Sequence, residues 1–249
     1  MANQTDNVHD VYSQGGDMLS RILAFLKSID IDPDNLSWDE LHVCDQMHSR
    51  GIEATREHAE HAGITSGMHV LEIGCGIGGA SRYLAHELGC QVTAIDLTQD
   101  CVDAAKDLSA RCGLAEMTDF RQADATDLPF EEAVFDHVWS HAMTMNIQDK
   151  TKLASEIARV LKPGGQYSCC EVALNGPGNP HYPLPWASDA SSSFLVPPDN
   201  MIAAFEAGGL KFVRRIDIND VYLAYLDDIR DRAQRGEKPA RIDPQSLKE

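Results

Sequence analysis

A glycine-rich turn that follows a short apolar run carries the clearest chemical signal in this sequence. Glycines recur at every second position as Gly74, Gly76 and Gly78, directly after the run 70–73. Glycine permits the backbone conformations of a tight turn and lets a ligand approach the main chain. A helix that starts after such a turn presents free N–H groups at its N-terminus. The pattern therefore predicts a binding site for a nucleotide-like cofactor.

Glu72, two positions before the first glycine, discriminates between two cofactor classes. Taking Gly74, Gly76 and Gly79 gives the Gly-x-Gly-x-x-Gly spacing of dinucleotide-binding proteins. A carboxylate at this strand end would repel a pyrophosphate, but it suits the cationic methionine portion of S-adenosylmethionine. We therefore expect S-adenosylmethionine, and an NAD-dependent oxidoreductase remains an alternative.

Two further acidic residues follow predicted strands. Asp96 ends the predicted strand 91–96, where a carboxylate can accept hydrogen bonds from both hydroxyls of a ribose. Leu97 comes next, and the basic residue that an NADP-specific protein would place nearby is missing from 97–99. Asp124 lies just past the predicted strand 118–122, on the sheet edge where ligands bind, and its carboxylate suits the adenine amino group.

The elements that position these residues alternate between strands and helices. Apolar periodicity predicts strands at 69–73, 91–96, 118–122, 135–140, 166–173 and 210–218, and helices at 17–29, 38–62, 80–88, 99–112, 152–161, 199–207 and about 220–235. The proline-rich stretch 175–186 is predicted to be a long functional loop. This order predicts an α/β fold with a doubly wound, mostly parallel sheet. We expect a helical extension at 1–62 and a cofactor-binding domain at 63–249.

Charge and cysteine usage narrow the class of protein. The 249 residues contain 21 Lys+Arg against 39 Asp+Glu, a formal net charge of −18, which argues against nucleic acid and against an anionic membrane surface as partners. Seven cysteines without zinc-like spacing predict reduced thiols, no metal site and a cytoplasmic protein. The sequence contains no run of membrane-spanning length, and because its first residues lack a basic region followed by an apolar one, we expect no signal peptide.

The glycine turn with Glu72, together with Asp96, Asp124 and the segment 161–165 (Leu-Lys-Pro-Gly-Gly), resembles the class I S-adenosylmethionine-dependent methyltransferases. The resemblance covers about residues 55–218 and implies the strand order 3-2-1-4-5-7-6. It places the glycine turn under the methionine portion, Asp96 at the ribose and Asp124 with Ala125 at the adenine. The expected cofactor-binding set is Glu72, Gly74, Gly76, Gly78, Asp96, Leu97, Asp124, Ala125 and Ser140.

Within that family, the segment 45–54 is similar to small-molecule methyltransferases that include the sarcosine/dimethylglycine N-methyltransferases. The chain departs from the family at its end, because little after Asp220 favours a seventh strand. Strand 7 is either missing or replaced. An open sheet edge would invite pairing with another chain, so we expect a possible homodimer.

Acceptor-side candidates lie on three segments. His141, just past the fourth predicted strand, is a candidate base or substrate hydrogen-bond donor, because the ordinary pKa of histidine lies near neutrality. Gln46 and His48 are further catalytic candidates on the predicted helix 38–62, which would place residues 45 and 48 on one face. The candidate substrate-binding residues are Arg50 for an acceptor carboxylate, and Tyr182 and Trp186 on the proline-rich loop.

The sequence thus predicts an enzyme that moves a methyl group from S-adenosylmethionine to a small molecule. An amine nitrogen of a sarcosine- or dimethylglycine-like acceptor is the leading interpretation. An O- or C-methyltransferase of secondary metabolism is an alternative within the same class. A non-catalytic cofactor-binding protein that kept the fold is an alternative of another class.

Overall fold

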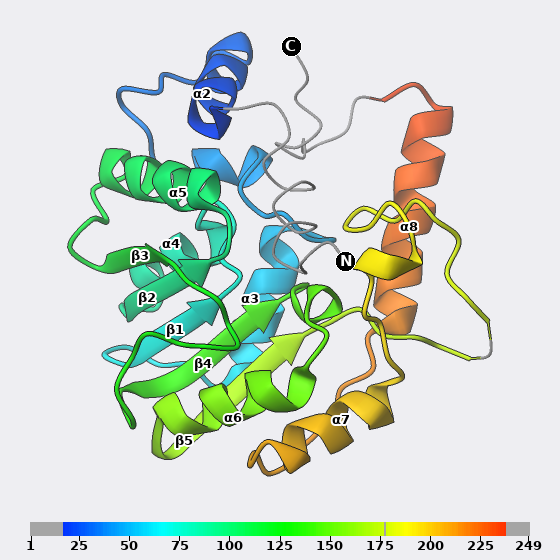
Figure 1. Ribbon diagram of the computed structural model, residues 1–249. Helices are drawn as coiled ribbons and strands as arrows, with labels where there is room; N and C mark the ends of the chain where they lie inside the picture. Colours follow the sequence, from blue (N-terminus) through cyan, green and yellow to red (C-terminus); the bar gives the residue numbers. More distant parts are fainter. Residues whose placement is uncertain (1–16, 177, 238–249) are drawn as a thin grey trace.

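A five-stranded parallel sheet forms the centre of the computed structural model, which describes residues 17–176 and 178–237 (Figure 1). Its order is β3-β2-β1-β4-β5. The strands are β1 (His69–Ile73), β2 (Gln91–Asp96), β3 (Thr118–Gln122), β4 (Phe135–His141) and β5 (Leu161–Cys170). The chain switches direction from β3-β2-β1 to β4-β5 beside β1, as a doubly wound sheet requires. The expected fold class is confirmed.

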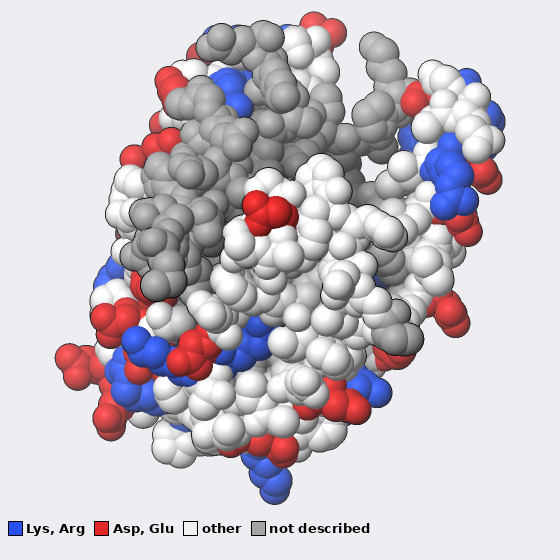
Figure 2. Space-filling model, turned by 45° about the vertical axis from the view of Figure 1, so that its right-hand side comes forward, with Lys and Arg blue, Asp and Glu red and all other residues white. Residues whose placement is uncertain are grey.

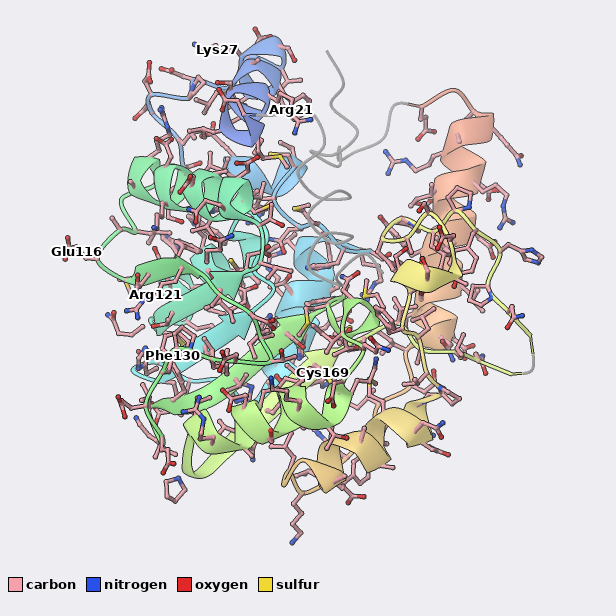
Figure 3. All side chains as sticks on the ribbon, viewed as in Figure 1. Arg21, Lys27, Glu116, Arg121, Phe130 and Cys169 are labelled. Atoms are coloured by element: carbon pink, nitrogen blue, oxygen red, sulfur yellow. The ribbon has the colours of Figure 1, made fainter. Side chains whose placement is uncertain are left out.

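Helices cover both faces of this sheet (Figure 1). The α-helices are α2 (Met18–Ser28), α3 (Ile52–Ala62), α4 (Gly79–His86), α5 (Gln99–Arg111), α6 (Lys150–Val160), α7 (Pro198–Ala207) and α8 (Asn219–Gln234). Three 3-10 helices lie at Glu40–Val43, Thr144–Asn146 and Ala190–Ser192. In Figure 3, the labelled Arg121 on β3 and Cys169 on β5 mark the two edges of the sheet.

Alternation along β1 separates the two halves of the core. Val70 packs with α3, α4 and α5, whereas Leu71 and Ile73 face the opposite side and pack with α6. Because successive side chains of a strand point to opposite faces, a fully apolar strand is what a sheet covered on both sides needs. Glu72 breaks that run, and it is buried on the α4 side through its contact with Ser81.

The N-terminal extension is part of the packed structure. Met18, Ile22 and Leu26 share one face of α2 and pack on Cys101, Ala104 and Leu108 of α5 in a third apolar cluster. Asp17 caps α2 by accepting a hydrogen bond from the Ser20 backbone N–H. The helix predicted at 17–29 is therefore confirmed.

The helix predicted over 38–62 is wrong in its first half. Residues 40–43 form a single 3-10 turn, residues 44–51 form no helix, and α3 begins only at Ile52. Arg50 and Gly51 have φ values of 65° and 52°, which a right-handed helix cannot contain. Asp45 and His48 therefore do not share a helix face.

The sixth predicted strand is also wrong. Residues 211–218 pair with no strand, and Phe212, Val213 and Ile216 are exposed. Among residues 17–176 and 178–237, nothing follows β5 in the sheet, so the order stops at five strands. The apolar residues of this segment suggested a strand, but the segment pairs with no strand and these side chains stay exposed.

The proline-rich region after β5 is irregular, as expected. A short isolated bridge joins Leu184 and Ala187, and the Tyr182–Pro183 peptide bond is cis. The segment is tied back to the sheet edge, since Phe194 N donates to Met145 O at 2.8 Å and the buried Lys150 Nζ donates to Phe194 O at 2.7 Å.

The surface and the thiols give two further observations. Acidic and basic side chains alternate along the lower part of the face in Figure 2, around a broad uncharged area. All seven cysteines are free thiols.

No helix among the described residues is long and apolar enough to span a membrane.

The packing of α2 generates a stability prediction. Ile22 is fully buried, so Ile22→Ala should lower the free energy of unfolding by about 2–5 kcal/mol. Ile229 on α8 is also an isoleucine but is 44% exposed, so Ile229→Ala should change the free energy of unfolding by less than about 0.5 kcal/mol. Urea unfolding followed by circular dichroism measures both. Equal losses would contradict the view that the extension belongs to the core.

Candidate active site

Two backbone hydrogen bonds shape the glycine turn. The N–H groups of Gly74 and Cys75 both donate to the carbonyl of Ile95, at 2.8 and 3.0 Å, so the turn is tied to the end of β2. Gly74 has a φ of 76°, and a Cβ there would lie 2.6 Å from Met143 Cγ. Glycine is required at this position by both conformation and space.

Asp96 holds the turn from the neighbouring strand. Its Oδ2 accepts from Gly76 N at 2.8 Å and its Oδ1 from Thr98 N at 2.9 Å. Burial raises the pKa of this carboxyl, although the backbone hydrogen bonds from Thr98 and Gly76 act in the opposite direction. Each carboxylate oxygen has two acceptor positions, so Asp96 can hold the turn and still accept from ribose hydroxyls.

Glu72 lies buried beneath the turn. Only 4% of the residue is exposed, and the Ser81 hydroxyl of α4 donates to its Oε2. Burial raises the pKa of Glu72 to about 8, although Ser81 and Arg82 lower it. A cation placed near this carboxyl would favour its ionised form.

The remaining residues of the expected cofactor set differ in accessibility. Asp124 is exposed and its Oδ1 accepts from Thr126 N at 2.7 Å, while Ala125 beside it is buried. Leu97 is half-buried, and its carbonyl accepts from Gln122 Nε2. Ser140 is fully buried, and its hydroxyl bonds to Tyr167 and Glu171 of the β5 side.

Glu171, immediately after β5, is a site residue that the sequence reasoning missed. Its Oε2 accepts from the N–H groups of Met143 and Thr144 and from the Thr144 hydroxyl, at 3.0, 2.9 and 2.8 Å. Burial raises its pKa despite these bonds. Glu171 thereby fixes the turn that presses Met143 against Gly74. Its signal in the sequence was a lone acidic residue at the end of an apolar strand.

The segment 45–48 lies against the glycine turn and the start of α4. A Cβ on Gly79 would lie 2.3 Å from the Asp45 carbonyl oxygen, so the two backbones touch directly. A Cβ on Gly76 would lie 3.1 Å from Met47 Sδ. Asp45 also accepts from Arg82 of α4 at 3.0 Å, and both side chains are excluded from solvent. The segment that carries Gln46 and His48 therefore packs directly against the glycine turn and the start of α4.

His48 and His141 meet at the carboxyl end of β4. Their rings stack with centroids 3.5 Å apart and an interplanar angle of 10°. His58 of α3 packs edge-on to His141 at 5.5 Å and stacks on Trp139 at 3.6 Å. Burial, with contributions from His48, His58 and Arg50, holds the pKa of His141 well below its ordinary value. The pKa of His58 is lowered to about 3 by its burial.

The three substrate-binding candidates lie on two segments. Arg50 donates two hydrogen bonds to Glu57 of α3, at 2.7 and 2.5 Å, and the arginine side chain is 12% exposed. Tyr182 and Trp186 lie on the irregular loop, where the Trp186 indole donates to the Ser193 hydroxyl at 3.2 Å. Their rings are not part of the stack formed by His48, His58 and His141. Among the described residues, no cluster fits a metal ion.

Comparison with known proteins places this site in context. Residues 71–169 match a family model described as a methyltransferase domain. The chain is 37% identical over 142 residues to a chloroplastic tocopherol O-methyltransferase of Arabidopsis thaliana, covering 54% of this chain and 40% of that protein. It is 34% identical over 130 residues to phosphoethanolamine N-methyltransferase 1 of Zea mays, covering 52% and 25%.

A solved structure supports the fold. Phosphoethanolamine N-methyltransferase 2 of Haemonchus contortus, in complex with S-adenosyl-L-methionine, gives a TM-score of 0.69 at 20% identity, over 94% of this chain and 50% of that one. This likeness shows the fold alone. The chain spans less than half the length of both curated relatives.

The buried Glu72 generates a prediction about pH. Its folded-state pKa of about 8 lies above its ordinary value of 4.5, so the fold prefers the neutral carboxyl. That contribution to stability is fully present below the ordinary value and is lost as pH rises toward 8. In Glu72→Gln the free energy of unfolding should therefore change less over this range than in the parent protein. Urea unfolding at about pH 5 and about pH 8 measures the difference.

Glu116→Gln is the matched control for this experiment. Glu116 is exposed at the periphery of the molecule (Figure 3). Its substitution should leave the pH dependence of unfolding as it is in the parent protein. A Glu72→Gln profile that is parallel to the parent profile would contradict the assignment.

Proposed function

We propose that this chain, whose residues 71–169 match a methyltransferase-domain model, transfers a methyl group from S-adenosylmethionine to a small molecule, and that the acceptor atom is an amine nitrogen of a sarcosine- or dimethylglycine-like molecule. The observation that carries the proposal is the pairing of two carboxyl groups, the buried Glu72 and the half-buried Asp96, with one glycine turn. Glu72 lies beneath the turn and Asp96 holds it from β2. The first suits a sulfonium-bearing amino acid, and the second suits a ribose.

The residues around the turn fit this cofactor. Glu72, Gly74, Gly76 and Gly78 would hold the methionine portion, and Asp96 with Leu97 the ribose. Asp124, Ala125 and Ser140 complete the proposed set. When bound, S-adenosylmethionine supplies an electrophilic methyl group on a cationic sulfur. The protein then has to align the nucleophile with that methyl and exclude water.

The acceptor side is formed by His48, His141 and Arg50. An amine nucleophile needs a base only to reach its neutral form, whereas a hydroxyl or carbon nucleophile depends more on a positioned base. The lowered pKa of His141 keeps that ring neutral at physiological pH, so it accepts or donates a hydrogen bond without adding charge. Arg50 would bind an acceptor carboxylate, and Tyr182 and Trp186 would bound the pocket from the loop.

An O-methyl acceptor is the second candidate within this class. It is favoured because this chain is 37% identical to the tocopherol O-methyltransferase but 34% identical to phosphoethanolamine N-methyltransferase 1 over the matched residues. A cofactor-binding protein without turnover is the candidate of another class.

Several features of the whole protein belong to the proposal as well. Residues 1–62 would act as an extension over the acceptor side, and 63–249 as the catalytic domain. Within the extension, residues 45–47 contact the glycine turn and the start of α4. Among residues 17–176 and 178–237 no further strand pairs with the edge of β5, and this edge would support a homodimer, which sedimentation analysis tests. Free cysteines fit a reducing compartment, the cytoplasm, and the acidic composition disfavours nucleic acid and membrane partners.

Transfer of labelled methyl tests the function directly. The protein is incubated with labelled S-adenosylmethionine and, separately, glycine, sarcosine, dimethylglycine, phosphoethanolamine and a pool of phenols. Labelling of an amine is the expected result. Labelling of the phenols alone would replace N-transfer with O-transfer, and cofactor binding without labelling of either would favour the non-catalytic candidate.

The Arg50–Glu57 pair generates a prediction for a carboxylate-bearing acceptor. Arg50→Ala should raise the acceptor KM on the order of 10-fold, because a hydrogen bond to a charged group contributes about 1.5–3 kcal/mol. Glu57→Gln should lower it, since Glu57 competes for the same guanidinium. The KM for S-adenosylmethionine should not change. Steady-state kinetics measure these constants, and Arg230→Ala, which removes an exposed arginine of α8, is the control. An unaltered acceptor KM in Arg50→Ala would refute the role of Arg50.

A further inference from the structure

A buried lysine links two segments of the acceptor side that lie far apart in the sequence. Lys150 is the first residue of α6, and only 6% of it is exposed. Its Nζ donates to the carbonyl of Ile147 at 2.8 Å and to the carbonyl of Phe194, 44 positions further along the chain, at 2.7 Å. An ammonium that leaves water needs such acceptors to offset its lost hydration. Because both acceptors are main-chain atoms, Lys150 fixes the course of the backbone in both segments.

The first of these segments is the turn that follows β4. His141 is the last residue of β4, and Ile147 lies at the far end of the turn. Glu171 holds the first half of this turn through three hydrogen bonds, and Lys150 holds its last carbonyl. Burial lowers the pKa of Lys150, whereas the negative charge of Glu171 acts in the opposite direction and stabilises the ammonium. The turn that begins at His141 is therefore held from both ends by charged groups.

The second segment is the loop of residues 182–196, which lies beyond the end of β5 (Figure 1). The Phe194 main chain is bonded on both sides, because its N–H donates to a carbonyl of the β4 turn at 2.8 Å and its own carbonyl accepts from Lys150. Ser193, the residue before it, accepts from the indole N–H of Trp186 at 3.2 Å. A continuous series of bonds thus leads from Lys150 through Phe194 and Ser193 to the ring of Trp186.

We propose that Lys150 is a positioning residue that links the loop of Trp186 to the turn of His141, so that the two sides of the acceptor pocket keep a fixed separation. The inference rests on the proposed function, in which His141 and Trp186 face the acceptor. Methyl transfer requires the nucleophile to be aligned with the methyl carbon, and a misplacement of about 1 Å can cost on the order of 100-fold in rate. Lys150 supports this alignment by holding main chain on both sides of the pocket.

Hydrogen exchange measured by NMR tests the link without turnover. In the parent protein the Phe194 amide should exchange at least about 100-fold more slowly than an unprotected amide. Lys150→Met, which keeps the apolar stem and removes the donor, should speed exchange in 182–196 by about 10-fold or more and leave α4 unchanged. Lys150→Arg, which keeps the charge and the donors, should restore part of the protection.

Lys152→Met is the matched control for this experiment, because Lys152 lies two positions further along α6 and is exposed. Its exchange pattern should match that of the parent protein. An unprotected Phe194 amide in the parent protein would overturn the proposal. Equal exchange of 182–196 in Lys150→Met and in the parent protein would also overturn it.

Kinetics provide the second readout. Lys150→Met should raise the acceptor KM on the order of 10-fold, as a misplaced pocket wall would, and leave the KM for S-adenosylmethionine unchanged. Trp186→Ala should raise the acceptor KM as well. If Lys150 acts through Trp186, the double variant should lose little more than either single variant. Effects that multiply in the double variant, or an equal rise of both KM values in Lys150→Met, would identify Lys150 as merely structural.

Should Lys150→Met fail to fold, Ser193→Ala and the parent protein still decide the question. Ser193→Ala removes the hydroxyl that accepts from Trp186, so it should raise the acceptor KM while the Phe194 amide stays protected. An unaltered acceptor KM in Ser193→Ala would refute the proposed series of bonds. Absence of methyl transfer by a parent protein with a protected Phe194 would refute the proposed function and leave the link standing, so the two failures are distinguishable.

Discussion

The buried ion pair between Arg82 and Asp45 is the interaction on which the site depends. It joins α4, which begins at the glycine turn, to the N-terminal segment that lies on that turn. Removing one partner from such a pair leaves an uncompensated buried charge, which typically costs about 3–5 kcal/mol. The pair thus holds together α4 and the N-terminal segment around Asp45, which are far apart in the sequence. It also anchors the hydrogen bonds that continue through Gln46 to Thr55 and His48.

Three carboxyl groups, the buried Glu72 and the half-buried Asp96 and Glu171, organise the edge of the sheet at the carboxyl ends of its strands. Glu72 bonds to Ser81, Asp96 holds the N–H of Gly76, and Glu171 holds the turn at Met143 and Thr144. Burial raises the pKa of each. Asp96 and Glu171 accept hydrogen bonds from the loops beside them, and Glu72 accepts one from α4, so these segments are fixed before any ligand arrives. Such preorganisation lowers the cost of ordering a site upon binding.

The sequence predicted the strand, turn and helix around the glycines well, because the signals for these elements are local. Each of these predictions depends only on residues that are neighbours in the sequence. They are the apolar run 70–73, the glycines after it, and Asp96 at the end of the next strand. The acceptor half depends on contacts between distant segments. The stack of His48 on His141 and the position of Glu171 arise from tertiary packing that no periodicity reveals. Residues 38–62 looked helical because their apolar residues repeat, yet left-handed backbone at Arg50 and Gly51 interrupts the helix. Residues 210–218 have the composition of a strand but find no strand to pair with.

Calorimetric titration of S-adenosylmethionine and of NADH into the same protein tests the central claim. That claim is that the glycine turn, which Asp96 holds and beside which Glu72 is buried, is a site for S-adenosylmethionine. The account predicts saturable binding of S-adenosylmethionine, no binding of NADH, and a large loss of affinity in Asp96→Ala but not in Asp119→Ala, which changes an exposed carboxylate of β3. Binding of NADH in preference to S-adenosylmethionine, or equal affinities in the two variants, would contradict it.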